Sequence, residues 1–123
     1  MKIIAITLFV LVGCAGGPVT RQPVAYDFPT CTTKDCEVKW SRALQWIQQK
    51  SAFGIRLMND SMIETFPSTG AMNPRLAYRA TKIAQGDGRY QIRIEATCGN
   101  FIACTESPQE FTRGMIRFIE TGQ

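Results

Sequence analysis

Residues 76–98 carry the strongest structural pattern in the chain. Apolar residues recur from Leu76 to Ala84, and apolar and polar residues alternate strictly over residues 89–98. Gly-Asp-Gly at 86–88 stands between them and is typical of a two-residue hairpin turn, since its residues tolerate positive φ. The pattern predicts two long antiparallel strands with one face buried and the other in water.

Two shorter strands are expected before this hairpin. Ile55–Met58 and Met62–Phe66 are largely apolar, and the turn-forming residues 59–61 lie between them. The alternative is one long strand over residues 55–66. With one strand fewer, each later strand of the meander would run in the opposite direction.

A helix is expected on each side of the strands. In the first, Thr33 or Asp35 can serve as the cap. Its apolar residues fall on one helical face: Cys36, Trp40, Ala43, Leu44 and Ile47. In the second, Ser107 and Glu110 form a capping box around Pro108 at the first helical position.

These elements predict an α+β fold. A four-stranded antiparallel meander should carry an N-terminal and a C-terminal helix packed on one face, which makes a two-layer domain. A chain of 123 residues is long enough for one such core. We expect residues 31–123 to form this single domain.

The N-terminus has a different character. Lys2 precedes a run from Ile3 to Val12 that is apolar except for Thr7. Ten helical residues reach about 15 Å, half of a bilayer core of about 30 Å. The run is too short to span a membrane and is typical of a signal peptide.

This run ends in Leu11-Val12-Gly13-Cys14, which resembles the lipobox of bacterial lipoproteins. The resemblance implies that residues 1–13 are removed and that Cys14 receives a diacylglycerol, with a further acyl chain such as palmitate on its amine. Ala15, in place of Asp, implies delivery to the outer membrane, facing the periplasm. An ordinary secretory signal cleaved after Ala15 is the alternative.

Residues 14–30 are expected to be the lipidated cysteine and a flexible tether. The stretch after Cys14 holds three prolines and two glycines and has no apolar period. Tyr26 and Phe28 leave open a second interpretation, in which they dock on the domain as an apolar strap.

The remaining four cysteines are Cys31, Cys36, Cys98 and Cys104. An even number in an exported chain indicates disulfides. A four-stranded meander places Cys98 at the end of the sheet opposite Cys36, beyond the reach of a disulfide. This favours the local pairs Cys31–Cys36 and Cys98–Cys104, whereas one long strand over 55–66 would allow cross-links such as Cys36–Cys98.

Catalysis finds little support in the residues. The chain has no histidine, which excludes Ser-His-Asp and Cys-His mechanisms. The cysteine spacings match neither a redox pair nor a zinc site. Glu64 and Glu95 can be neighbours on adjoining strands, but nothing sets their distance. We expect no catalytic residue, cofactor or metal site.

Binding is the better expectation. Arg79, Arg89 and Arg93 should share the wet face of the sheet, a possible site for an anionic partner such as a phosphate or a carboxylate. The balance of 14 Lys and Arg against 10 Asp and Glu does not indicate nucleic acid.

The chain as a whole, with "DCEVKW", "IETF" and its last two cysteines, resembles small proteobacterial envelope lipoproteins. We expect a lipid-anchored, non-catalytic envelope lipoprotein that acts as a binding or assembly module. Its expected partners are the membrane, through the lipid, and an envelope protein, but no nucleic acid. A small periplasmic inhibitor or ligand-binding lipoprotein is the alternative.

Overall fold

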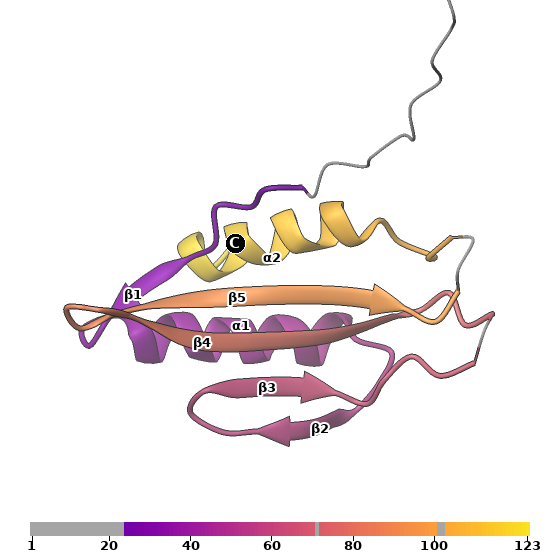
Figure 1. Cartoon of the computed structure of the whole chain (residues 1–123), viewed down its shortest axis with the longest axis horizontal. Coiled ribbons are helices and arrows are strands. Elements are labelled where there is room, and N and C mark those ends of the chain that lie inside the picture. The colour runs from indigo at the N-terminus through magenta and orange to yellow at the C-terminus, as the bar shows by residue number, and fades with distance from the viewer. Residues whose placement is uncertain (1–23, 71, 101–102) are drawn as a thin grey trace, which may run out of the picture.

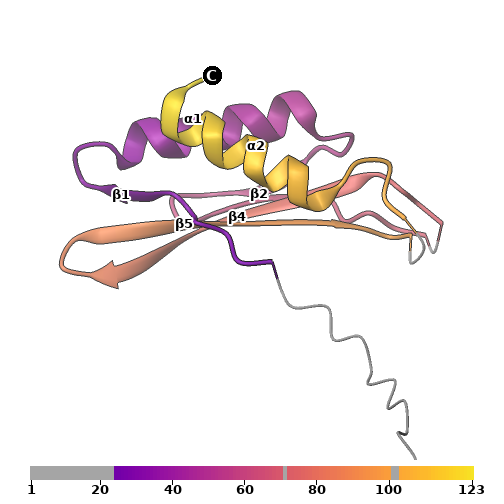
Figure 2. The same ribbon diagram turned by 90° about the horizontal axis from the view of Figure 1, so that it is seen from above.

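The computed structural model describes residues 24–70, 72–100 and 103–123. Its elements are β1 (Thr30–Thr32), α1 (Cys36–Lys50), β2 (Ile55–Met58), β3 (Met62–Thr65), β4 (Leu76–Gly86), β5 (Arg89–Cys98) and α2 (Pro108–Thr121). The strands form one antiparallel sheet in the order β1-β5-β4-β3-β2. Both helices lie on the same face of the sheet (Figures 1 and 2), so the α+β class and the two layers are confirmed.

The expected number of four strands was wrong, because the sheet has five. The additional strand β1 lies at the end of the expected tether and pairs with the start of β5, with Cys31 opposite Tyr90. Pro29 just before it is fully buried, and Phe28 packs against the core. Folded structure therefore begins before Cys31, and the strap interpretation of Phe28 describes this segment better than a solvated linker.

The β2–β3 hairpin excludes the single long strand. Asn59 makes the turn, with its side-chain Oδ1 accepting hydrogen bonds from the backbone N–H groups of Ser61 and Met62 at 2.9 and 2.8 Å. A bulge interrupts the pairing between Ile55 and Leu57. The four strands β2 to β5 thus form the predicted meander, and Cys98 lies far along the sheet from Cys36.

The β4–β5 hairpin matches its pattern. Asp87 and Gly88 both have positive φ, 50° and 78°, as a two-residue turn of this kind requires. The strands pair from Leu76 opposite Cys98 to Gly86 opposite Arg89. β4 and β5 are the two longest strands and form the centre of the sheet.

The core lies between the sheet and the helices. Burying each of its large apolar side chains stabilises the fold by roughly 1.5–3 kcal/mol. The fully buried ones come from both layers: Ile47, Ile63, Ile92, Met115 and Ile119. Tyr78 of β4 stacks on Phe111 of α2 with ring centroids 4.4 Å apart, which joins the second helix to the middle of the sheet.

Candidate functional site

Both helices lie on one face of the sheet, and Figure 2 shows the other face, here the open face, without a helix. Strand alternation and register place the predicted arginines on this open face. The register places Arg79 opposite both Glu64 of β3 and Glu95 of β5. Residues directly opposite one another project to the same side. Glu64, Arg79 and Glu95 therefore form a row of alternating charge across three strands.

Ion pairs connect this row. Arg79 contacts Glu64 at 2.9 Å and Glu95 at 3.5 Å, and Arg56 of β2 reaches the other oxygen of Glu64 at 2.6 Å. The hydrogen bond from Arg79, with that from Arg56, holds the pKa of the Glu64 carboxyl below its usual range. The same bond raises the pKa of Arg79. Both charges of the central pair are thus stabilised by each other.

The three predicted arginines differ in their surroundings. Arg79 is held by two carboxylates, and Arg89 contacts Asp87 of the hairpin turn at 3.2 Å. Arg93 lies opposite Thr81, and its side chain has no ion pair within the described part of the chain. The open face therefore carries both charges, since Arg56 and Glu64 also lie on it. Among its arginines, Arg93 is the most available to an anion, because the others form ion pairs.

Glu64 and Glu95 are not on adjoining strands, because β4 lies between β3 and β5 and places Arg79 between the two carboxylates. Both contact Arg79 beside a shallow hollow of about 220 Å³, which Pro67 and Thr97 also line. A general acid needs a raised pKa, whereas that of Glu64 is lowered. The arrangement therefore favours the ionised form of Glu64 rather than a general acid. In residues 24–70, 72–100 and 103–123, no group of His, Cys, Asp or Glu could hold a metal ion.

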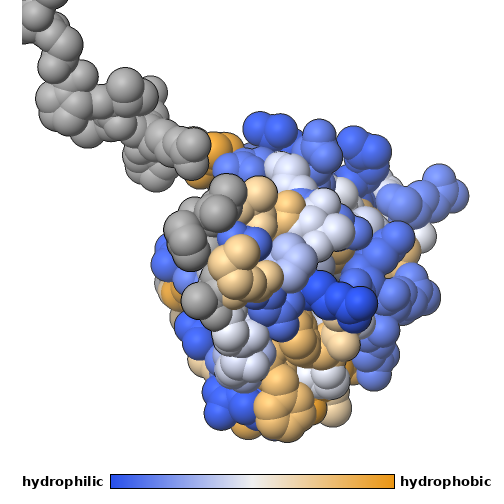
Figure 3. Space-filling model, turned by 90° about the vertical axis from the view of Figure 1, so that its right-hand side faces the viewer, coloured by the Kyte–Doolittle hydropathy of each residue, from blue (hydrophilic) through white to orange (hydrophobic). Residues whose placement is uncertain are grey.

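A second hollow, of about 420 Å³, lies where α1 ends and α2 begins. Trp46 contributes to its floor and packs against Phe111 with ring centroids 5.5 Å apart. Lys50 lies over the Trp46 ring at 5.3 Å, and Glu106 and Glu110 also line the hollow. Figure 3 shows hydrophobic and hydrophilic side chains interleaved over this end of the domain. The sequence pattern did not indicate this hollow, because its residues come from segments far apart in the chain.

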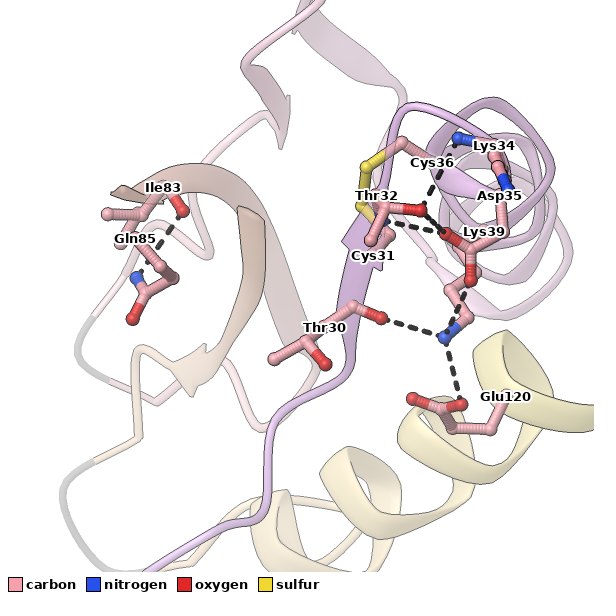
Figure 4. The surroundings of a disulfide bond; sticks show 10 residues. All are labelled: Thr30, Cys31, Thr32, Lys34, Asp35, Cys36, Lys39, Ile83, Gln85 and Glu120. Atoms are coloured by element: carbon pink, nitrogen blue, oxygen red, sulfur yellow. Dashed lines mark hydrogen bonds and ion pairs between the residues drawn. A yellow bond between two sulfur atoms is a disulfide. The ribbon is translucent and has the colours of Figure 1, made fainter. Parts of the chain in front are cut away.

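Two disulfides cross-link the domain. Both are the local pairs that were expected if four strands, rather than three, follow the first helix. Cys31–Cys36 joins β1 to the first residue of α1, with Cα atoms 4.8 Å apart (Figure 4). Cys98–Cys104 links the end of β5 to the segment before α2, with a Cα separation of 5.8 Å. Cys14, the expected lipidation site, lies outside the described residues.

Beside the first disulfide, the outer side of β1 is closed by hydrogen bonds (Figure 4). Lys39 Nζ donates to the carbonyl of Thr30 at 2.7 Å, and the Asp35 carboxylate accepts from the N–H of Thr32 at 2.7 Å. The N–H of Asp35 donates to the Thr32 carbonyl at 3.2 Å. Lys39 also forms ion pairs with Asp35 and with Glu120 of α2. We call this closed side the β1 edge.

Asp35 has a different role from the one expected. It stands at the N-cap position of α1, but its side chain makes no cap hydrogen bond to that helix. The bond from the backbone of Thr32, followed by that from Lys39, holds the pKa of Asp35 below its usual range. The carboxylate therefore seals the strand before the helix rather than the helix itself.

No protein-family model matches this chain. No curated protein matches it either. Neither helix of the described residues is both long and apolar enough to cross a membrane.

Proposed function

We propose that this chain is a lipid-anchored, non-catalytic lipoprotein of the bacterial cell envelope. It would face the periplasm from the outer membrane and act as a binding or assembly module. The observation that carries the proposal is the apolar run of residues 3–12, which ends in Leu11-Val12-Gly13-Cys14. A single cysteine in that position is the acceptor that lipidation requires.

The disulfides support export. Cys31–Cys36 and Cys98–Cys104 account for every cysteine other than Cys14. Disulfides persist in oxidising compartments such as the periplasm and are rare in a reducing cytosol. The odd cysteine thus falls outside the disulfide framework, at the place where a lipid would be attached.

The path of the chain suits a tether. Residues 24–29 lead into β1, on the side of the sheet opposite β2 (Figure 1). The residues between Cys14 and Val24 can extend to about 35 Å at most. An anchor at Cys14 would keep the domain near the membrane and leave β2 and the open face available to a partner.

The residues of the open face favour binding of a partner over catalysis. Arg79 contacts both Glu64 and Glu95, and its hydrogen bond lowers the pKa of the Glu64 carboxyl, which favours the ionised form of Glu64. Arg93 is the cation that an anionic group on an envelope partner could meet most directly. Partner binding would thus use Arg93, with the charged row beside it setting the orientation.

The test is the intact mass of the full chain recovered from membranes of an expressing bacterium. We expect a chain that begins at Cys14 and carries diacylglycerol and a further acyl group. A Cys14→Ser control should lose this mass and leave the membrane fraction. An Ala15→Asp variant should move the lipidated protein to the inner membrane. A wild-type chain that begins at Gly16 without added lipid would overturn the proposal.

A further inference from the structure

The second edge strand of the sheet, β2, is left open. It pairs only with β3. The N–H of Asn59 donates to the carbonyl of Met62 across the hairpin, and strand alternation then turns the N–H and carbonyl of Met58 outward. In the described residues no side chain or loop bonds to the outer side of Ile55–Met58. The nearest cap is Trp40, whose Nε1 donates to the Asn59 carbonyl at 3.2 Å.

Exposed apolar side chains lie on this strand and next to the hairpin. Leu57 is 39% exposed, Met58 57%, and Phe66, the residue after β3, 52%. Edge strands are usually protected by charged side chains, by covering loops or by a strong twist. The single charge on β2 is Arg56, and Glu64 of the same chain already holds it at 2.6 Å. We call this open, apolar side the β2 edge.

We propose that the β2 edge binds the β2 edge of a second copy of this chain. The two strands would run antiparallel about a two-fold axis and join two sheets into one continuous sheet. The inference rests on the proposed membrane anchor, which supplies the second copy at high local concentration. It makes the assembly role specific, because the partner is the chain itself.

The register follows from the outward groups. If the two β2 strands pair with Leu57 of one copy opposite Leu57 of the other, the outward groups of Met58 can form backbone hydrogen bonds with the β2 strand of the second copy. The two Leu57 side chains then face each other in a non-hydrogen-bonded pair, with Cα atoms about 4.5 Å apart. Such a pair brings together two apolar residues that are exposed in the single domain.

Charge and geometry favour a second copy as the occupant. The internal Arg56–Glu64 pair neutralises the one cation of the edge in each copy, so no unpaired like charges meet. The tethers would leave from the two outer β1 edges and could both reach one membrane. Because two four-residue strands bury little area, anchoring must supply the effective concentration that the contact lacks in solution.

The experiment is cross-linking of a Leu57→Cys variant of the full chain in its membrane. We expect a disulfide-linked dimer on non-reducing gels, formed several-fold more than by a Val38→Cys control. Val38 is more exposed than Leu57, at 52% against 39%, but lies on α1. Adding Met58→Pro should reduce the dimer to the control level. Proline removes the outward N–H and keeps the bonds to β3. Circular dichroism and the two native disulfides report that each variant is folded.

Two outcomes would overturn the inference. One is equal dimer from Leu57→Cys and Val38→Cys, and the other is a Leu57→Cys cross-link to a different protein without dimer. The intact mass separates this failure from that of the anchor. Lipid on Cys14 without the dimer refutes only the edge pairing. A dimer without lipid refutes the anchor and shows that the edge pairing does not depend on it.

Discussion

The two edges of the sheet meet the same physical problem in different ways. At the β1 edge, Lys39, Asp35 and the Cys31–Cys36 disulfide occupy or enclose the outward backbone groups. At the β2 edge, no described residue bonds to the outward backbone groups of Met58, and its side chain is 57% exposed. An unpaired edge can template pairing with another strand. The comparison indicates that one edge is closed for folding and the other is available for association.

The residues that bond to the β1 edge are close to β1 in sequence. Cys36, Asp35 and Lys39 all follow β1 within the turn and the first helical turns of α1. β2 is followed by a tight turn into β3, so no helix is at hand to cover its outer side. Sealing an edge thus depends on which element comes next in the chain.

The largest expected effect is the loss of the disulfide at the β1 edge. Replacing Cys31 and Cys36 together by serine should lower the free energy of unfolding by about 2 kcal/mol or more, because a constraint on the unfolded chain is removed. Urea unfolding measures the loss, and amide exchange at Thr32 should accelerate.

The matched control is the double replacement of Cys98 and Cys104 by serine, since the two disulfides close loops of nearly equal length, with sequence separations of 5 and 6. It should cost a similar free energy, so exchange at Thr32 should accelerate only by the amount that the global loss of stability explains. In the variant without Cys31 and Cys36, exchange at Thr32 should accelerate beyond that amount. Equal acceleration at Thr32 in both variants would contradict a specific role for Cys31–Cys36 at this edge.

Lys39→Met should have the next largest effect. The Lys39 side chain is only 14% exposed and its ammonium meets Thr30, Asp35 and Glu120. Methionine keeps the apolar stem, so a loss of about 1–2 kcal/mol would report the charged hydrogen bonds. Lys34→Met, in an exposed residue of the same turn, should stay within about 0.5 kcal/mol. Equal effects in a thermal or urea melt would show that Lys39 does not seal the edge.

Acid should weaken both sides of the molecule. The folded pKa values of Asp35 and Glu64 are lowered, so each stabilises the fold above its unfolded pKa of about 4 and loses this effect as the pH falls. Asp35→Asn should make the free energy of unfolding less dependent on pH below about pH 5. Adding Glu64→Gln should flatten it further. An unchanged slope in the double variant would show that other carboxylates carry the acid sensitivity.

The smallest effect is expected at the β2 edge. Met58→Ser should change the free energy of unfolding of the dilute Cys14→Ser chain by no more than about 0.5 kcal/mol, because the side chain is mostly exposed. Equilibrium urea unfolding at low protein concentration measures it. A loss near that of the Cys31 and Cys36 replacement would mean that this edge also stabilises the single domain.

Local patterns were enough for most elements. The alternation over 89–98, the turn at Asp87-Gly88 and the Ser107 cap of α2 each depend on neighbouring residues, and each is confirmed. The parity of the strands then favoured the local disulfides. β1 escaped prediction because three residues are too few to show a period. Its position depends on pairing with β5, a segment far along the chain.

On the open face, too, some features follow from local sequence patterns and others from the pairing of distant strands. By itself, the sequence determined that Arg79 and Arg93 project to one side of a half-buried sheet, because side chains alternate along a strand. It also marked Cys14 as the odd cysteine after an apolar run. Only the tertiary structure decided that Glu64 and Arg56 come to Arg79 and that one edge is sealed while the other is open. Register and edge position depend on which distant strands pair, and no local period records that.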